Sequence, residues 1–520
     1  MNQHLIFLIL SLKKTLLFTI ILISCTLSAQ TFRNLGLHTQ VDHVQPMTGI
    51  VFWTDNGSDL NTLGDKVQLT FSYLVYADIV SQENVYDWSV VDDLLEDAAN
   101  QGRQVILRFR YTYPGETTPS VPQYIRNRGD YTDQIMNVEG SSTYIPDWSN
   151  QELQDFTMEF FTNFANRYDT DERVAFLQIG FGSYSEYHLY DGPFQFGQTF
   201  PTKAYQTTFL QHVDAVFNET QWAISIDAAD GSHTPISSNN TLKNLNYGLF
   251  DDSFLHEEHS ENDNEYNRAS WLLFGENRAN TNVAGGELNY YSNYDQEHVL
   301  DTPNGPWGTS FEELAALYDI SYMIGNDQLN YQSSARIEEA GMNIGYHYEV
   351  TQFRTNGTIT EVTITNTGLA PIYYDAYPTV AGIRSTESLK GLTSGQSRSF
   401  TINTNAESES LTITSDRLVT GQEIQFDADL DESILSVTEV FVDDTSVISY
   451  PNPFKDELTI TLKNTTPVQV SIFNILGSSI FQQEVITDDY TIDTSRFKTG
   501  IYILKTESAH NSSIQTIIKQ

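Results

Sequence analysis

The stretch VAFLQIGFGSYSEYH, residues 174–188, starts with an apolar run of strand length and ends in a turn that contains two glycines and a glutamate. A continuous apolar run is typical of a strand that is covered on both faces, as in a parallel sheet. The preceding residues, 153–168, have the apolar spacing of an amphipathic helix. Further apolar runs of this kind occur at 49–53, 67–74, 104–111, 222–228, 246–250, 282–290 and 320–325.

Amphipathic helical patterns separate these runs. Residues 88–102 place their apolar side chains on one helical face, and residues 310–318 begin with a serine cap and an acidic first turn. Eight predicted strands with helices between them are typical of an α/β fold. They predict a (β/α)8 barrel over residues 31–335. An open doubly wound sheet is the alternative. It is disfavoured because no glycine-rich phosphate loop follows the first strand.

The sequence after the barrel has a β pattern only. Short runs of strand-forming residues, separated by Gly, Asn, Ser and Pro, occupy residues 336–432 and predict an accessory β-sandwich. Residues 433–447 are expected to be a linker. Residues 448–520 again alternate apolar and polar positions in short runs, which predicts a small C-terminal β-sandwich.

The composition excludes several classes of partner. The chain has 520 residues, 68 of them acidic and 27 basic, and its net charge is −41 at pH 7. Such a charge opposes binding to nucleic acid or to an anionic membrane through a general electrostatic field. The single cysteine excludes a disulfide framework and a cysteine-ligated zinc site. No stretch after the N-terminal segment has the ~20 apolar residues of a membrane span.

The N-terminal segment has the pattern of an export signal. Residues 1–30 contain Lys13 and Lys14, then the apolar run LLFTIILIS, then a small-residue site near Ala29. We therefore expect a chain that is exported after removal of a signal peptide. The alternative is a lipoprotein signal, in which Cys25 would be lipidated and become the first residue of an anchored protein.

The C-terminal residues carry a specific set of motifs. They are Tyr450-Pro451-Asn452-Pro453-Phe454, Asn474-Ile475-Leu476-Gly477, Gly500-Ile501-Tyr502 and the penultimate Lys519. In these motifs the last 70 or so residues resemble the type A sorting domain of the type IX secretion system of Bacteroidetes. The resemblance implies the type IX secretion machinery as a partner, with release from the cell or attachment to its surface.

Two glutamates follow predicted barrel strands, where the chemistry of such barrels is found. Glu186 follows the fourth strand after Gly180 and Gly182, and Glu287 ends the seventh strand after another glycine pair. Glycoside hydrolysis needs two carboxyl groups facing each other across a cleft. One protonates the leaving oxygen, and the other attacks the anomeric carbon or activates water.

With this pair of glutamates, the barrel resembles the clan A glycoside hydrolases. That resemblance implies Glu186 as the acid/base and Glu287 as the nucleophile. More closely, residues 35–430 resemble the paired bacterial domains DUF 4874 and DUF 4832, through FGSYSEYH at 181–188 and NTGLAPIYY at 366–374. The sequence departs from that group at Tyr184 and Ser185, where tryptophan and glycine are usual, and this changes the wall of the pocket.

Other polar and aromatic residues are candidates for substrate binding. Arg108 and Arg110 share one face of the third strand, from which they would reach a carboxylate or an anionic sugar substituent. We expect His188 and Tyr290 to orient the glutamates. Three tryptophans are candidates both for sugar-stacking platforms and for core packing, which is the more frequent role: Trp53, Trp271 and Trp307.

A different second carboxylate remains possible. Asp227 ends the fifth strand, and Glu258 lies in the sequence HEEH that follows the sixth. The histidines and glutamates of HEEH are also candidate metal ligands, but their spacing is not that of the H-E-x-x-H motif. We therefore expect no metal and no cofactor.

Together these features predict a secreted or cell-surface glycoside hydrolase that acts on a polysaccharide or oligosaccharide. With Glu287 as nucleophile the mechanism is retaining, which requires carboxyl groups ~5 Å apart; an inverting mechanism requires ~6.5 to 9.5 Å. The alternative is a non-catalytic polysaccharide-binding protein on a degenerate hydrolase barrel. The substitution Glu186→Gln discriminates between the two, because only catalysis requires the acid.

Overall fold

The computed structural model describes residues 32–188, 192, 194–259, 265–275, 277–404, 410–432, 448–461, 467–475, 477–486, 489–507 and 512–520. The predicted export signal, Cys25 and the linker at 433–447 lie outside the described residues. The chain divides into two units, Met1–Leu435 and Ser436–Gln520, and each is described by itself.

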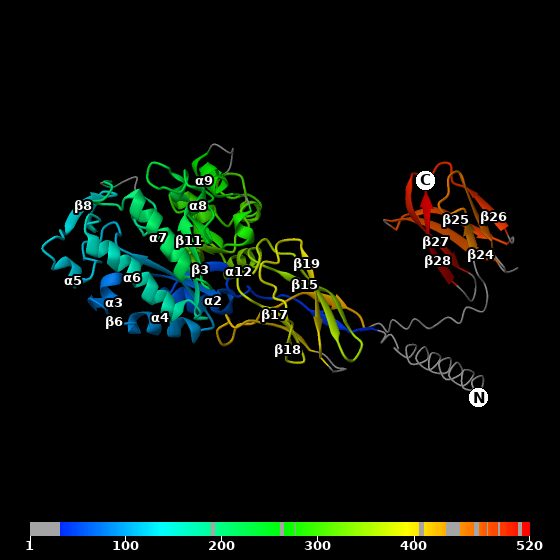
Figure 1. Cartoon of the computed structure of the whole chain (residues 1–520), viewed down its shortest axis with the longest axis horizontal. Helices are drawn as coiled ribbons and strands as arrows, with labels where there is room; N and C mark the ends of the chain where they lie inside the picture. Colours follow the sequence, from blue (N-terminus) through cyan, green and yellow to red (C-terminus); the bar gives the residue numbers. More distant parts are fainter. Residues whose placement is uncertain are drawn as a thin grey trace, which may run out of the picture. The chain divides into compact units, whose positions relative to one another are not determined.

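The first unit contains a closed barrel of parallel strands, each hydrogen-bonded to the next one along the chain (Figure 1). It confirms the predicted (β/α)8 barrel and every predicted barrel strand. The last barrel strand pairs with the first, and the third pairs with the fourth. The strands are β3 (Gly49–Trp53), β4 (Leu69–Val75), β7 (Gln104–Arg110), β10 (Val174–Ile179), β11 (Gln221–Ser225), β12 (Tyr247–Phe254), β13 (Ala284–Leu288) and β14 (Tyr322–Ile324).

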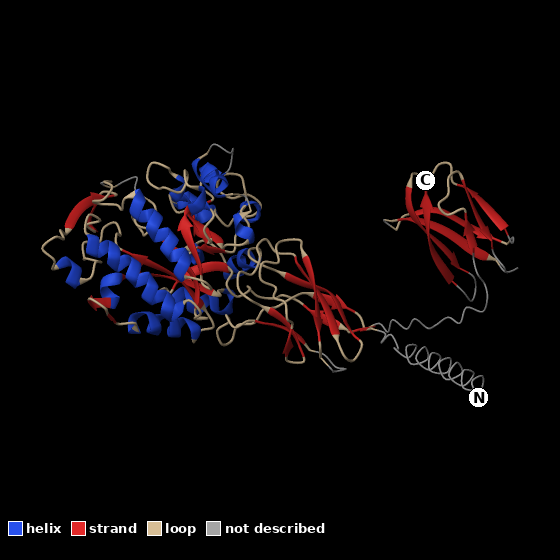
Figure 2. Cartoon of the chain, viewed as in Figure 1, coloured by secondary structure: helices blue, strands red, loops and turns tan. Residues whose placement is uncertain are grey.

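Helices surround the barrel strands (Figure 2). The predicted serine cap is present: Ser310 and Glu313 form a reciprocal capping box at the start of one helix. Asn150 caps another by accepting a hydrogen bond from the backbone N–H of Leu153. The helices are α2 (Gly57–Leu63), α3 (Tyr76–Ile79), α4 (Ser89–Ala99), α5 (Gln123–Arg126), α6 (Gln151–Tyr168), α7 (Lys203–Val216), α8 (Asn240–Lys243), α9 (Tyr266–Phe274), α10 (Asn293–His298), α11 (Phe311–Leu317) and α12 (Ser334–Met342).

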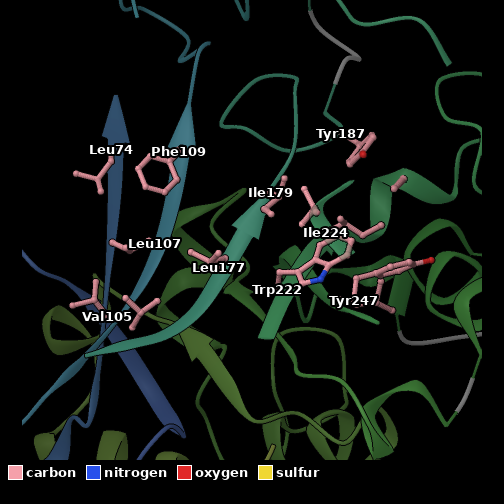
Figure 3. Packing of buried hydrophobic residues seen from close by; sticks show 14 of the residues in the cluster. Leu74, Val105, Leu107, Phe109, Leu177, Ile179, Tyr187, Trp222, Ile224 and Tyr247 are labelled. Atoms are coloured by element: carbon pink, nitrogen blue, oxygen red, sulfur yellow. The ribbon is translucent and has the colours of Figure 1, made fainter. Parts of the chain in front are cut away.

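Alternate residues of each barrel strand face the helices or the barrel interior. On β7, Val105, Leu107 and Phe109 belong to the apolar layer between strands and helices (Figure 3). The ring of Phe109 lies 4.8 Å from that of Phe160 on α6. Ile106, between them in sequence, belongs to the separate cluster inside the barrel. The next inward position on this strand is therefore Arg108.

The accessory domain consists of β-sheets. One sheet has the order β1-β15-β16-β19 and another β18-β17-β20, while β2 pairs with β21. The first two strands of the chain thus belong to these sheets rather than to the barrel, and the predicted boundary at residue 335 falls within α12. The strands are β1 (Arg33–Asn34), β2 (Leu37–Thr39), β15 (Tyr348–Thr355), β16 (Thr360–Asn366), β17 (Tyr377–Val380), β18 (Ile383–Arg384), β19 (Ser397–Ile402), β20 (Leu411–Thr414) and β21 (Ala428–Leu430).

The segment between β16 and β17 closes the barrel at the N-terminal end of its strands. Tyr374 stacks on Phe176 with ring centroids 6.1 Å apart, and its hydroxyl accepts a hydrogen bond from the backbone N–H of Gln221. The hydroxyl of Tyr373 donates to the carbonyl of Ala279 at 2.7 Å. Arg417, also from the accessory domain, packs over the ring of Tyr374. These buried contacts make the accessory domain part of the barrel's core.

The second unit is a small β domain with two sheets, β22-β23-β26 and β25-β24-β27-β28, around its own apolar core. This arrangement agrees with the predicted C-terminal β-sandwich. No helix in the described part of the chain is both long and apolar enough to span a membrane. The strands are β22 (Ile448–Tyr450), β23 (Glu457–Thr461), β24 (Val468–Asn474), β25 (Ser479–Val485), β26 (Asp489–Asp493), β27 (Gly500–Glu507) and β28 (Ser512–Lys519).

We predict that Arg417→Leu destabilises the first unit by about 2 to 4 kcal/mol. The buried guanidinium donates to the carbonyls of Val174 and Asp169 and to the hydroxyl of Thr220, and leucine leaves all three without this donor. Thermal unfolding followed by tryptophan fluorescence measures the effect, because all six tryptophans lie in the barrel.

The matched control is Arg384→Leu, which removes an exposed ion pair with Asp416 and costs less than about 1 kcal/mol. Equal losses of stability for the two variants would contradict the assignment of Arg417 to the barrel closure.

Candidate active site

Arg108 occupies the centre of the barrel, close to the C-terminal ends of the strands. It is 2% exposed, and its Nε donates to Oε1 of Gln178 on β10 at 2.8 Å. Its Nη1 donates to the hydroxyl of Tyr73 and to the carbonyl of Tyr184, both at 3.2 Å, and forms an ion pair with Oε1 of Glu186. The arginine on the third strand thus contacts a carboxylate from inside the barrel.

The loop that carries Glu186 folds back on itself directly after β10. The backbone N–H groups of Phe181 and Gly182 donate to the carbonyl of Glu186, at 3.1 and 2.7 Å. The hydroxyl of Ser185 donates to the carbonyl of Phe109 on β7 at 2.6 Å. A Cβ at Gly180 would lie 2.2 Å from the carbonyl oxygen of Ser185, so only glycine permits this approach.

The carboxyl group of Glu186 is buried, and the residue is 2% exposed. Burial raises its pKa well above the usual 4.5; Arg108 opposes this, while Asp252, Asp227 and Glu287 add to it. Oε2 has no hydrogen-bond partner among the described residues. One oxygen of Glu186 is therefore held by Arg108, and the carboxyl group also lies within hydrogen-bond reach of Asp252.

Glu287 lies on β13 and faces the barrel interior. The preceding inward position is Gly285, where a Cβ would lie 2.4 Å from the ring of Tyr322, so the absence of a side chain leaves room for that ring. Burial raises the pKa of Glu287 to about 8; Arg108 opposes the shift, while Asp252 and Asp327 add to it. Both glutamates also act on Arg108. Burial lowers the pKa of its guanidinium, whereas Glu186 and Glu287 each raise it.

Two more carboxyl groups complete a row at the ends of four consecutive strands. Asp227 follows β11 and Asp252 lies on β12, between the positions of Glu186 and Glu287. Burial and the neighbouring aspartates raise the pKa of both. Sequence analysis missed Asp252 because the sixth strand was predicted to end at Phe250. The strand continues to Phe254. The acidic pair Asp251-Asp252, directly after Phe250, is the feature of the sequence from which Asp252 could have been found.

The remaining predicted residues of the third and fourth strands lie near the mouth. Arg110 pairs with Glu116 at 2.8 Å and packs over the ring of Tyr113, so it does not contact either glutamate. The hydroxyl of Tyr184 donates to Oε2 of Glu139 at 2.7 Å. Nε2 of His188 lies 3.4 Å from the other oxygen of Glu139. Glu139 lies in the turn between β8 (Gln134–Val138) and β9 (Ser141–Ile145), which thus extends to the site.

Aromatic residues after β13 form an exposed group. The rings of Tyr290 and Tyr291 are stacked, with centroids 5.6 Å apart. Tyr290 is 40% exposed, and its partial burial, followed by the charges of Asp252, Glu287 and Glu186, raises its pKa. This ring is therefore close to the carboxyl groups. Trp307 is 43% exposed, and its ring lies 6.4 Å from that of His256, which also contacts Tyr291.

The HEEH sequence lies beside a different network. His259 and Trp271 both contact the buried carboxylate of Asp251, with Nε2 and Nε1 at 2.5 and 3.0 Å. These contacts outweigh burial and hold the pKa of Asp251 below its usual value. Trp271 also stacks on Tyr318, which places it in the core and corrects its candidacy as a sugar platform. Glu258, on a 3-10 turn, makes no ion pair within the described part of the chain.

Comparison with known proteins identifies the second unit. Residues 449–520 match the family model described as a secretion system C-terminal sorting domain. This confirms the predicted type IX sorting domain, which indicates secretion and attachment at the cell surface. An endo-acting ulvan lyase of Formosa agariphila is 31% identical over 84 residues, and ulvan lyase NLR42 of Nonlabens ulvanivorans is 35% identical over 86 residues. Each match spans 16% of the relative's length and 15 to 16% of this chain.

Solved structures with similar folds include glycoside hydrolases. Endo-glycoceramidase II of Rhodococcus sp. has a TM-score of 0.36 at 10% identity, with 72% of this chain and 100% of that chain covered. The endo-β-1,4-mannanase of Thermotoga petrophila has a TM-score of 0.34 at 7% identity, with 92% and 98% covered. At these values any assignment of chemistry depends on the residues of this barrel itself.

We predict that Glu287→Gln stabilises the protein increasingly as the pH rises. A carboxyl group whose pKa is about 8 when folded and near 4.5 when unfolded contributes no penalty below pH 4.5. Between these values folding becomes less favourable as the pH rises, and the penalty is complete above pH 8. Glutamine does not ionise, so the variant gains on the order of 3 kcal/mol relative to the wild type between pH 5 and 9.

The measurement is the difference in thermal midpoint between the variant and the wild type at pH 5, 7 and 9. The exposed Glu219→Gln serves as the control, with a difference that does not change with pH. A pH-independent difference for Glu287→Gln would show that its carboxyl group ionises in the folded protein as it does in water.

Proposed function

We propose that this chain is a secreted or cell-surface glycoside hydrolase whose two catalytic carboxyl groups are those of Glu186 and Glu287. The observation that carries the proposal is their position: both face the interior at the C-terminal ends of barrel strands, and both act on the same buried guanidinium, that of Arg108. The C-terminal ends of the strands are where (β/α)8 barrels carry their chemistry.

In the proposed reaction Glu186 is the general acid and Glu287 the nucleophile. Glu186 protonates the glycosidic oxygen through Oε2, the oxygen that Arg108 does not hold, while Glu287 attacks the anomeric carbon in its ionised form. Because the pKa of Glu287 is raised to about 8, the fraction of Glu287 that is ionised increases as the pH approaches 8. Water then cleaves the glycosyl-enzyme, with Glu186 acting as base. Arg108 fixes the position of Glu186 and lies inside the barrel, below the point where the sugar binds.

The rim supports binding of a sugar chain. Exposed aromatic rings are suitable for stacking on the apolar faces of pyranose rings, and Tyr290, Tyr291 and Trp307 lie on the side of the mouth that follows β13. Tyr184 and Arg110 form part of the opposite wall. The sorting domain supports a substrate outside the cell. Such a location suits a polysaccharide that is too large to be imported.

We predict that Glu186→Gln and Glu287→Gln each lower kcat/KM by a factor of about 10³ or more, because each removes a group that acts in the transition state. The assay measures reducing ends released from neutral, uronic and sulfated polysaccharides, with ulvan included because of the two named relatives. Ultraviolet absorbance of an unsaturated product end is followed in parallel, since only a lyase creates one.

The control is Glu258→Gln, which alters one of the two alternative candidate carboxylates and is expected to retain activity within a few-fold. Nuclear magnetic resonance of the first product anomer then separates retention from inversion. Release of unsaturated ends would replace hydrolysis by elimination. Tight glycan binding that both glutamine variants retain, without turnover by the wild type, would leave a non-catalytic binding protein.

A further inference from the structure

We propose that His188, Asp227 and Asp252 bind a divalent transition-metal ion beside Glu186. Each residue offers one ligand atom, and these three atoms all lie within 4.8 Å of one another. The sequence does not bring these residues together, since they are separated by 39 and 25 positions (227 − 188 and 252 − 227). Folding alone brings them together.

The register of the barrel explains why the two aspartates meet. Strands β11 and β12 are parallel neighbours in which Ser225 pairs with Phe250. Asp252 lies two residues beyond Phe250 on the same face of β12, and Asp227 lies in the 3-10 turn, Ile226–Ala229, that directly follows β11. Phe250 belongs to the cluster inside the barrel, so the carboxyl group of Asp252 is directed to the interior, and that of Asp227 lies within 4.8 Å of it.

His188 joins them from the third neighbouring strand, β10. The loop after β10 turns back so that Ser183 and His188 form an isolated bridge, with the N–H of Ser183 donating to the carbonyl of His188 at 3.1 Å. A Cβ at Gly182 would lie 2.4 Å from that carbonyl oxygen, so the return of the chain requires glycine there. The imidazole is thereby fixed next to the two carboxylates.

A second observation points to a ligand at this place. Oε2 of Glu186 belongs to a residue that is 98% buried, and it receives no hydrogen bond from a donor group among the described residues. The carboxyl group of Glu186 lies within hydrogen-bond reach of Asp252, so these two acidic groups crowd each other. The nearest fixed cation is Arg108, which is already engaged with Gln178, with the carbonyl of Tyr184 and with Oε1 of Glu186. Crowded buried carboxylates are costly unless a positive charge neutralises them. A divalent ion supplies that charge.

The type of ligand indicates the type of ion. One imidazole nitrogen with two carboxylate oxygens suits Zn²⁺, Mn²⁺ or Fe²⁺, whereas Ca²⁺ and Mg²⁺ prefer oxygen ligands alone. Three protein ligands leave further coordination positions for other groups. Those positions would hold two neighbouring hydroxyl groups of the sugar next to Glu186. Only this last step rests on the proposed function.

The test measures metal binding directly and needs no activity. The full chain is freed of metal with a chelator, and uptake of Zn²⁺ and Mn²⁺ is followed by calorimetry and by elemental analysis. We expect one ion per chain, with affinity lowered on the order of 100-fold in Asp227→Asn and in Asp252→Asn. Asp230→Asn, which alters an aspartate that contacts His233 in the same loop, keeps the affinity of the wild type.

The visible spectrum with Co²⁺ provides a second readout, because replacing His188 by alanine alters the ligand field even if the ion still binds. Unchanged melting of the metal-free variants shows that they fold. Absence of stoichiometric uptake by the wild type, or equal affinity in Asp252→Asn and Asp230→Asn, would overturn the proposal. An inactive chain that takes up one ion through these residues would refute the hydrolase and leave the metal site standing.

Discussion

The buried guanidinium of Arg108 is the constraint on which the site depends. A charge inside a barrel is costly unless its donors are satisfied, and here they are satisfied by groups from several elements. Removing any one acceptor would leave part of the charge unpaired, so the loop after β10 and the strands around it are held in one arrangement. The contacts form a continuous column from the accessory domain to the buried carboxyl group of Glu186, through Tyr374, Phe176, Tyr322, Gln178 and Arg108.

This column gives the accessory domain a role inside the barrel. Tyr373 and Tyr374 fill the N-terminal end of the barrel, and the aromatic layer above them supports Gln178 through the hydroxyl of Tyr322. Gly285 has no side chain at the place where the ring of Tyr322 lies, which lets one large ring cross the interior. The same strand then presents Glu287 one inward position later. Packing at one end of the barrel and the position of a carboxylate at the other are therefore parts of the same core.

The barrel was predictable because strands buried on both faces appear as continuous apolar runs, and each of the runs became a strand. Glu186 and Glu287 were predictable because glycine pairs precede them at strand ends. The short strands β1 and β2 were not predictable, because two or three residues are too few to show the alternation of apolar and polar positions that marks a strand. Their pairing with β15 and β21 is visible only in the fold. Asp252 was missed for a different reason: acidic residues usually end a strand, whereas here Asp251 is compensated outside the barrel by His259 and Trp271, which allows β12 to continue.

The distribution of charge around Arg108 restricts what can bind. Glu186, Asp227, Asp252 and Glu287 lie at or after the C-terminal ends of four consecutive strands, and the guanidinium of Arg108 acts on all of them except Asp227. A polyanion entering this mouth would add like charge in a region of low dielectric, whereas sugar hydroxyls can donate hydrogen bonds to the carboxylates at no such cost. An ion between β10, β11 and β12 would add two positive charges beside Glu186 and offset the crowding of these carboxyl groups.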